Sequence, residues 1–211
     1  MTRLLILCEG PTEVDFVKTC LSPHLLGYGV YVSIQLIQPT GGNVSVDRLV
    51  HHLFELYRNY DRVTTFVDYY GFQRTEGRTK IELETAVLTN LGNRIGAGFD
   101  PKRVLPYIQM YEFEALLFSD VSKFQLVLDN WNEKVDNALT NVRNAFETPE
   151  NINNSRETSP ANRIDSAFGK GSFSKVLHGP MIAEAIGLAT IRQNCAGFDA
   201  WVGQLEEWGR P

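Results

Sequence analysis

The sequence predicts an α/β fold, a mostly parallel sheet covered by helices on both faces and followed by a mainly helical C-terminal portion. Short apolar runs alternate with segments of helical periodicity over residues 1–118, which is typical of parallel strands joined by right-handed crossover helices. These runs are continuously apolar, as expected for strands buried on both sides. With 211 residues and 43% hydrophobic side chains, the chain is expected to form one domain, a core over 1–118 and a packed helical extension over 119–211.

Four pairs of a strand and a helix are expected in the core. The predicted strands cover residues 4–8, 30–37, 62–67 and 104–110, and the predicted helices cover 14–21, 46–57, 79–91 and 112–118. Turn-forming residues separate them, including Gly10 and Pro11 after the first strand and the segment 39–42 after the second. Beyond the core, the periodicity predicts a helix over 124–146 and terminal helices over 181–205.

Composition and charge argue against several classes of protein. A net charge of −5 disfavours binding of nucleic acid by the whole surface and leaves room for a local basic face. The three cysteines, Cys8, Cys20 and Cys195, have no paired CxxC spacing, which favours reduced thiols over disulfides or structural zinc. The first residues lack a signal-peptide cleavage pattern, and no apolar stretch is long enough to cross a bilayer. A cytoplasmic protein that does not bind membranes is therefore expected.

Acidic side chains follow two of the predicted strands. Glu9 follows the first strand and Asp68 the third, at the edge of the sheet where ligand crevices of open parallel sheets lie. If these strands are neighbours, the two carboxylates face one another, an arrangement that a cation stabilises. Glu13, in the first turn of the next helix, is placed to reach the same cation, and oxygen ligands suit Mg²⁺ or Mn²⁺. The sequence therefore predicts a divalent-metal site built from these three acids.

Each of these acids also has a purely structural interpretation. Glu13 lies three residues after Gly10, so its carboxylate is equally suited to capping the backbone and complementing the helix dipole. Glu9 and Asp68 are each suited to satisfying backbone donors in a turn. The joint placement of the three acids, rather than any one of them, favours the metal site.

The segment after the fourth strand supplies a further candidate ligand. Glu112 and Glu114 are two residues apart, which puts them on different faces of the predicted helix. Glu112 lies nearer the strand end, so we expect it to join the metal site and Glu114 to be solvated or to cap the helix.

Several motifs resemble those of known families. EGPTE, followed by a strand that ends in DYYG, resembles the Toprim catalytic core of topoisomerases, primases and overcoming-lysogenization-defect nucleases over roughly the first half of the chain. The segments CEGPTEVDF, FVDYYGF, YEFEALLFSD, ETSPANRI and KVLHGPMIAEAIGLATIRQNCAGFDAWVGQLE together are similar to the bacterial domain-of-unknown-function family 4276, a Toprim-like group. This second resemblance extends over nearly the whole sequence and implies a Toprim-like fold.

The Toprim resemblance implies Mg²⁺-dependent phosphoryl transfer on nucleic acid. Glu9 then matches the motif glutamate, Asp68 the first aspartate of the second motif, and Glu13 the extra acid of the nuclease branch. In such a site, metal ions polarise the scissile phosphate and activate water while a carboxylate helps take the proton.

The second motif departs from the Toprim pattern at one position. Toprim domains carry another acid two residues after the aspartate, where this chain has Tyr70. An acid from the segment after the fourth strand would have to compensate, and without it the site would bind metal weakly or be catalytically silent. Tyr69, Tyr70 and Phe72 are candidates for a wall on which a nucleotide stacks, or are simply packed side chains.

Basic side chains late in the chain are candidates to stabilise a transition state. Arg163 and Lys175 fall within the segments that are similar to the family, and we assign them as catalytic candidates together with the two strand-end acids. Arg156 and Lys170 are expected to be solvated loop charges, an interpretation that stays open for the other two as well.

The leading functional hypothesis is a Mg²⁺- or Mn²⁺-dependent, nuclease-like effector in defence or DNA maintenance. The family resemblance suggests an ATPase partner of the ABC or SMC-like type, in keeping with the lack of a Walker-type loop in the chain. A non-catalytic adaptor subunit for such an ATPase is the alternative, favoured by Tyr70 and the acidic net charge. A small-nucleotide hydrolase would use the same acids. The sequence leaves open the choice among DNA, RNA and small nucleotides, and the oligomeric state.

Overall fold

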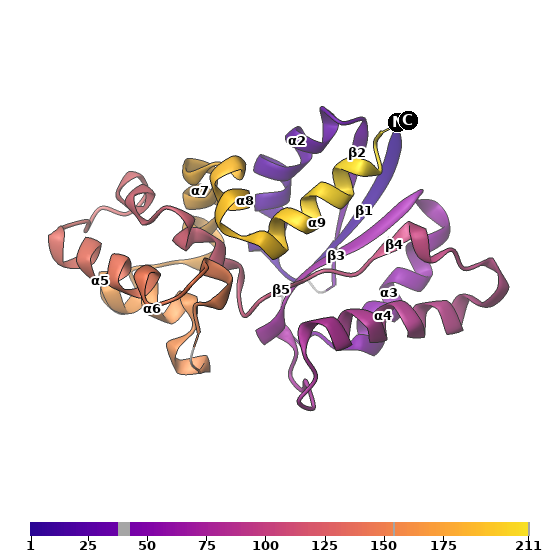
Figure 1. Ribbon diagram of the computed structural model, residues 1–211, viewed down its shortest axis with the longest axis horizontal. Coiled ribbons are helices and arrows are strands. Elements are labelled where there is room, and N and C mark those ends of the chain that lie inside the picture. Colours follow the sequence, from indigo (N-terminus) through magenta and orange to yellow (C-terminus); the bar gives the residue numbers. More distant parts are fainter. Residues whose placement is uncertain (38–42, 154, 211) are drawn as a thin grey trace.

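The computed structural model describes residues 1–37, 43–153 and 155–210 and contains the predicted parallel sheet with helices on both faces (Figure 1). The strands are β1 (Thr2–Cys8), β2 (Val30–Leu36), β3 (Arg62–Asp68), β4 (Val104–Leu105) and β5 (Ile108–Gln109). Their order is β2-β1-β3-β4, and β5 pairs with β3 beyond β4. In the parallel pairing of β1 with β3, Cys8 lies opposite Phe66, so these two central strands end at the same edge of the sheet.

The helices form two layers and a lobe. They are α1 (Pro11–Phe16), α2 (Ser22–Leu26), α3 (Val46–Leu56), α4 (Lys80–Ile95), α5 (Glu133–Asn144), α6 (Pro160–Phe168), α7 (Lys175–Ile186), α8 (Leu188–Asn194) and α9 (Ala196–Glu207). A π-helical turn, Val17–Leu21, joins α1 to α2. Helices α3 and α4 pack together on one face of the sheet, whereas α1, α2 and α9 lie on the other (Figure 1). Helices α5 and α6 form a lobe at one end of the molecule.

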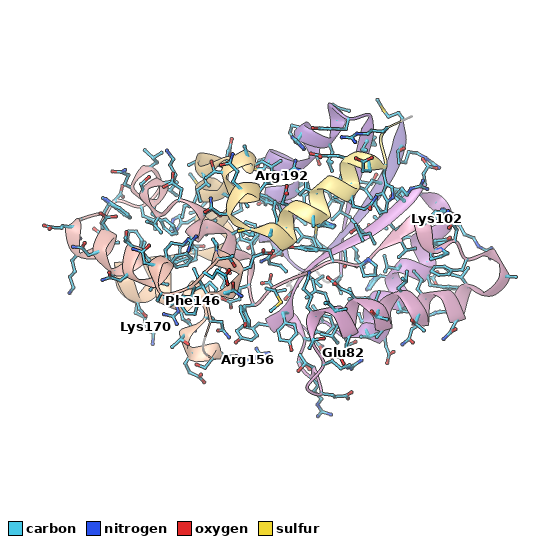
Figure 2. The ribbon with its side chains drawn as sticks, in the orientation of Figure 1. Glu82, Lys102, Phe146, Arg156, Lys170 and Arg192 are labelled. Carbon is cyan, nitrogen blue, oxygen red and sulfur yellow. The ribbon has the colours of Figure 1, made fainter. Side chains whose placement is uncertain are left out.

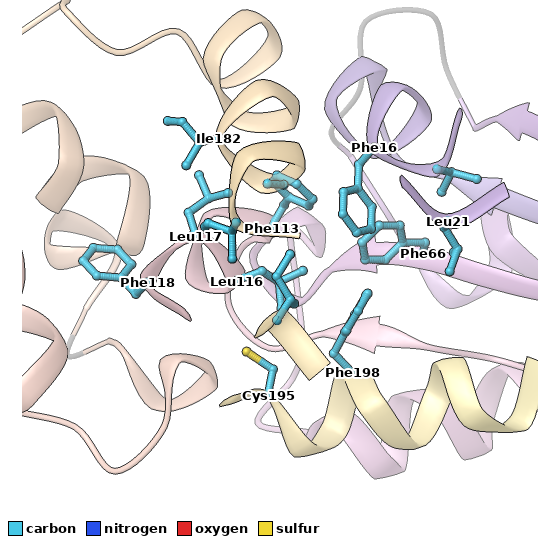
Figure 3. Close-up of a cluster of buried hydrophobic side chains, with 14 of the residues drawn as sticks. Phe16, Leu21, Phe66, Phe113, Leu116, Leu117, Phe118, Ile182, Cys195 and Phe198 are labelled. Atoms are coloured by element: carbon cyan, nitrogen blue, oxygen red, sulfur yellow. The ribbon is translucent and has the colours of Figure 1, made fainter. Parts of the chain in front are cut away.

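Two hydrophobic clusters separate along β1 because successive side chains of a strand point to opposite faces. Leu4, Ile6 and Cys8 join the larger cluster, while Leu5 and Leu7 join the smaller one beneath α3 and α4. The larger cluster contains phenylalanines from distant parts of the chain, including Phe16, Phe66, Phe113 and Phe198 (Figure 3). The C-terminal portion therefore completes the same core as the strands.

The first three predicted pairs of strand and helix in the core are present, with boundaries set by local capping. Helix α4 begins after Thr79, whose side chain accepts from the backbone N–H of Glu82 while the Glu82 carboxylate accepts from the backbone N–H of Thr79. It ends at Gly96, which adopts a positive φ of 73° that favours glycine. The predicted turn over 39–42 lies outside the described residues.

Three predicted elements differ in the structure. The strand over 104–110 is two short strands, because Pro106 has no N–H to donate to a ladder. The helix over 112–118 is a 3₁₀ helix, Phe113–Ser119. The single helix over 124–146 is wrong: a 3₁₀ turn, Val121–Leu126, is followed by an irregular stretch, and α5 begins only after Asn132, whose side chain caps it by accepting from the N–H of Lys134.

The chain ends beside its beginning. The hydroxyl of Thr2 donates to the carbonyl of Trp208 over 2.8 Å, and both termini lie at the same corner of Figure 1. Cys8 and Cys195 are buried, Cys20 is half-buried, and all three are free thiols. No helix in the described part of the chain has both the length and the apolarity needed to cross a membrane.

Candidate active site at the carboxyl edge of the sheet

A polar pocket of about 340 Å³ opens at the carboxyl edge of β1 and β3. Segments far apart in the sequence contribute its lining: Glu9, Asn43, Asp68, Tyr70, Gly71, Gln73, Glu112, Arg156 and Lys175. The loop around Asn43 is held beside the loop after β3 because the N–H of Val44 donates to the carbonyl of Gly71 over 2.9 Å. The sheet edge, and no single motif, thus assembles the site.

The two strand-end acids, Glu9 and Asp68, line the same pocket. Glu9 Oε2 accepts from the backbone N–H of Asp68 over 3.0 Å, and this bond holds the carboxylate of Glu9 at the end of the neighbouring strand β3. Gly71 leaves room for this arrangement, since a Cβ atom there would lie only 2.1 Å from Glu9 Oε2. A side chain at this position would therefore displace the Glu9 carboxylate.

Asp68 is held in an unfavourable electrostatic environment. Its Oδ1 atom is buried and accepts no hydrogen bond from the described residues. Burial raises the pKa of Asp68 well above its usual value, and repulsion from Glu13, Glu9 and Glu114 raises it further. A cation placed at this carboxyl group would relieve both effects.

Glu13 has the capping role that its position in the sequence allowed, and it lies close to the other acids. Its Oε2 atom accepts from the backbone N–H of Gly10 over 2.8 Å, which caps the start of α1. The side chain is nevertheless 5% exposed, and burial together with the charge of Glu9 raises its pKa to about 8. Glu13 is therefore a cap that also adds negative charge beside the pocket.

Glu112 and Glu114 both form ion pairs with the same residue, Lys175. Lys175 Nζ lies 3.0 Å from Glu112 Oε1 and 3.2 Å from Glu114 Oε2. The expectation that they lie on different helix faces is wrong because the 3₁₀ helix begins at Phe113, so Glu112 precedes it in an extended conformation. The positive φ of Tyr111, 59°, turns the chain there, a strained conformation that tends to occur at functional sites.

Lys175 is the cation that partly neutralises this group of acids. It occupies the first position of α7, and its side chain is 45% exposed, whereas those of Glu112 and Glu114 are 13% and 2% exposed. Burial lowers the pKa of Lys175, but the carboxylates of Glu114, Glu112 and Asp68 outweigh it and hold the pKa above its usual value. The ammonium group of this pocket residue therefore stays charged.

The structure reverses the predicted positions of two arginines relative to the pocket: Arg156 lines it and Arg163 does not. Arg163, expected as a catalytic candidate, lies on α6 outside the pocket, where its guanidinium donates to the carbonyl of Thr158 and covers the ring of Phe146. Arg156, expected as a solvated loop charge, lines the pocket and lies 4.8 Å from the centre of the Tyr70 ring. Figure 2 shows Arg156 between the lobe and the sheet. No sequence pattern distinguishes the two, because the choice depends on how the lobe packs.

Of the three aromatic residues predicted to form a wall of the site, Tyr70 lines the pocket and Tyr69 and Phe72 do not. Phe72 is buried in the core beneath α3 and α4, and Tyr69 packs against the same core. Tyr70 lines the pocket, and its hydroxyl accepts from the side-chain amide of Asn153. The residue that replaces the expected second acid therefore forms a side of the cavity.

A divalent ion fits this donor set only in part. The buried, unpartnered Oδ1 atom of Asp68 and the adjacent carboxylate of Glu9 are the oxygen donors that such an ion requires. Glu13 and Glu112 are held by Gly10 and Lys175, respectively. Across the ranges 1–37, 43–153 and 155–210, no group of three or more His, Cys, Asp or Glu side chains is arranged to hold a metal ion. Glu9 and Asp68 are thus the core of the candidate site.

Comparison with known proteins identifies the family. No curated protein and no solved structure matches the chain. The sequence profile of a domain of unknown function, DUF4276, matches residues 8–206 and so includes every residue discussed at the pocket. The chain therefore belongs to the DUF4276 family.

Proposed function

We propose that this protein is a divalent-metal-dependent phosphodiesterase that acts on nucleic acid. One observation carries the proposal: Glu9 and the unpartnered carboxyl oxygen of Asp68 meet at the carboxyl edge of the sheet, in a pocket that also contains Lys175 and Arg156. Acids that repel one another beside basic side chains are typical of sites that bind a phosphate together with a metal ion. The similarity of EGPTE and DYYG to Toprim motifs supports the same reaction class.

The residues of the pocket have distinct proposed roles. Glu9 and Asp68 would hold Mg²⁺ or Mn²⁺, which when bound polarises a phosphate oxygen and lowers the pKa of a water molecule. Lys175 and Arg156 would pair with the phosphate oxygens and stabilise the charge that develops on them. The wall formed by Tyr70 would position the neighbouring nucleotide.

The proposed setting is a cytoplasmic complex in defence or DNA maintenance. Free thiols at Cys8, Cys20 and Cys195 are compatible with a reducing compartment. An ATPase of the ABC or SMC-like type is the proposed partner, because the resemblance of the sequence to its family suggests one and the chain has no Walker-type loop.

A cleavage assay tests the proposal directly. Purified protein is incubated with end-labelled single- and double-stranded DNA and RNA, with Mg²⁺, Mn²⁺ or EDTA. We expect cleavage that requires the metal and falls by at least about a hundredfold in Glu9→Gln and Asp68→Asn, because each removes a charged oxygen ligand. Glu55→Gln, at an exposed carboxylate on α3, is the matched control and should cleave normally.

Two results would count against the proposal. Cleavage that survives in both Glu9→Gln and Asp68→Asn would show that a contaminant or another site is responsible. If no substrate is cleaved, also in the presence of the cognate ATPase, the active-enzyme assignment fails.

A non-catalytic adaptor is the second candidate function. It is favoured by Tyr70 at the position of the expected acid and by the ion pairs of Glu112 and Glu114 with Lys175, which occupy the acids that would have to compensate for it. An adaptor would bind its ATPase partner equally well in the wild-type and Asp68→Asn forms and would cleave nothing in either.

A further inference from the structure

Strand β2 lies at an outer edge of the sheet. Among the described residues β2 pairs only with β1, and the N–H of Ile37 donates to the carbonyl of Cys8 over 3.0 Å. Because backbone directions alternate along a strand, this bond shows that the odd-numbered residues of β2 direct their backbone groups toward β1. The groups that face away belong to Val30, Val32, Ile34 and Leu36.

Within Val30–Leu36, this edge has none of three features by which proteins commonly keep sheet edges from pairing. Such edges usually carry a charged side chain, a proline or a bulge. The strand VYVSIQL has neither a charge nor a proline, and it pairs with β1 in unbroken register from Val30 to Leu36. Tyr31 is 57% exposed on one side of the strand. An exposed, uncharged edge of this length is suited to pairing with another strand.

An apolar groove runs beside the same edge. It has a volume of about 310 Å³ and lies between α2 and the start of β2, lined by Lys18, Ser22, Pro23, Leu26, Val30, Tyr31 and Val32. Leu26 is 52% exposed at its rim. Even-numbered side chains of β2 point to this face of the sheet, since Val32, Ile34 and Leu36 pack against the larger hydrophobic cluster. A strand added at the edge would therefore also direct side chains toward the groove.

We propose that β2 pairs with β2 of a second copy of this chain in an antiparallel manner about a two-fold axis at Ser33, which joins the two sheets. In this register Val32 faces Ile34 of the second copy and Val30 faces its Leu36. These are the residues whose backbone groups point outward, so their N–H and C=O groups bond across the axis. The second copy's Ile34 and Leu36 lie on the face of the groove and pack toward Leu26.

The sequence of β2 favours a second copy as the partner because its residue types are symmetric about Ser33. Apolar residues occupy the even positions on both sides of Ser33, and the polar or aromatic pair, Tyr31 and Gln35, is also symmetric about it. No charges oppose one another across the axis. The short helix α2 precedes β2, so antiparallel pairing about Ser33 would place the two α2 helices toward opposite ends of the paired strands.

Cysteine cross-linking tests both the dimer and its register. Ser33 faces Ser33 in a non-hydrogen-bonded antiparallel pair, whose Cα atoms are about 4.5 Å apart, close enough for a disulfide. In a Cys20→Ser background, Ser33→Cys oxidised with copper phenanthroline should become a covalent dimer. Gln35→Cys is the matched control, because the two introduced thiols would be displaced by about 14 Å along the strands. Mixing Gln35→Cys with Tyr31→Cys should restore the cross-link.

Light scattering after gel filtration gives the second measurement. The wild-type chain should have the mass of a dimer at micromolar concentration, and Ser33→Glu should raise the dissociation constant by roughly fivefold or more, because like charges then face each other across the axis. A monomeric wild type overturns the proposal and assigns the edge to a different partner. Equal cross-linking of the Ser33→Cys and Gln35→Cys variants also overturns it, as does a dimer of Ser33→Cys that forms no disulfide on oxidation.

Discussion

Two groups of buried carboxylates in this protein have opposite electrostatic environments. Glu206, on α9, is 6% exposed and is paired with His24 over 2.6 Å and with Arg192. Burial alone would raise the pKa of Glu206, but these two partners lower it below its usual value. Glu13, beside the pocket, is 5% exposed, and burial together with Glu9 raises its pKa to about 8. The two residues are similarly inaccessible to solvent, but Glu13 is enclosed more deeply and Glu206 has cationic partners, so depth of burial and the supply of cations both contribute to the opposite shifts.

The difference separates a structural cluster from a candidate functional site. The α8 and α9 group has a cation for its buried acid, so the charges stabilise the folded protein as they stand. Around Asp68, burial and the repulsion of three other carboxylates outweigh the charge of Lys175, so the pKa of Asp68 remains well above its usual value. Buried acids without enough cationic partners destabilise the folded protein unless a bound cation supplies the missing positive charge.

The largest effect is expected from Arg192→Met, which leaves Glu206 buried without its guanidinium partner. Breaking a buried ion pair by removing one member costs about 3 kcal/mol in the free energy of unfolding. Urea denaturation at pH 7 measures the loss. Adding Glu206→Gln should recover part of it, because the buried negative charge, which then has only His24 as a partner, is gone. A loss below about 0.5 kcal/mol would mean that this cluster resembles an exposed ion pair, and the contrast would fail.

Glu13→Gln should make the protein more stable at high pH. The folded protein keeps a proton on Glu13 up to about pH 8, whereas an unfolded chain releases it near its ordinary pKa of 4.5. The free energy of unfolding of the wild type therefore falls as the pH rises through this range. At pH 9 in EDTA we expect the variant to be more stable by on the order of 2 kcal/mol, since glutamine can still accept from Gly10.

At pH 4 both forms of residue 13 are neutral, so Glu13→Gln and the wild type should unfold at nearly the same urea concentration. If the difference in stability is as large at pH 4 as at pH 9, the effect does not arise from buried charge. Glu55→Gln, at an exposed carboxylate, should show no such dependence on pH.

Gly71→Ala should damage the pocket more than it damages the fold. The added Cβ would lie 2.1 Å from Glu9 Oε2, so the Glu9 carboxylate has to move away from the backbone N–H of Asp68. We expect Mn²⁺ binding, measured by calorimetry, to weaken about tenfold. Gly203→Ala is the control, because a Cβ there meets no atom within 4 Å, and alanine should stabilise α9 by about 0.5–1 kcal/mol. Unchanged Mn²⁺ binding in Gly71→Ala would remove Glu9 from the proposed site.

The sequence predicted the sheet better than the site, for physical reasons. Continuous apolar runs and strand-end acids are local patterns, so β1, β3 and the positions of Glu9 and Asp68 followed from them. The engagement of Glu114 by Lys175 did not, because it depends on where α7 packs against the 3₁₀ helix that follows β5. The placement of Arg156 instead of Arg163 in the pocket likewise depends on packing over a long sequence separation.

The smallest effect is expected at an ion pair outside both groups. Lys18 lies 3.5 Å from Asp15, and the two side chains are 58% and 48% exposed. Water screens such a pair, so Lys18→Gln should change the free energy of unfolding by no more than about 0.5 kcal/mol at low salt and by less in roughly 0.5 M NaCl. Urea denaturation at the two salt concentrations measures this. A loss comparable to that in Arg192→Met would mean that burial does not distinguish these ion pairs, and the difference between Glu13 and Glu206 would then need another cause.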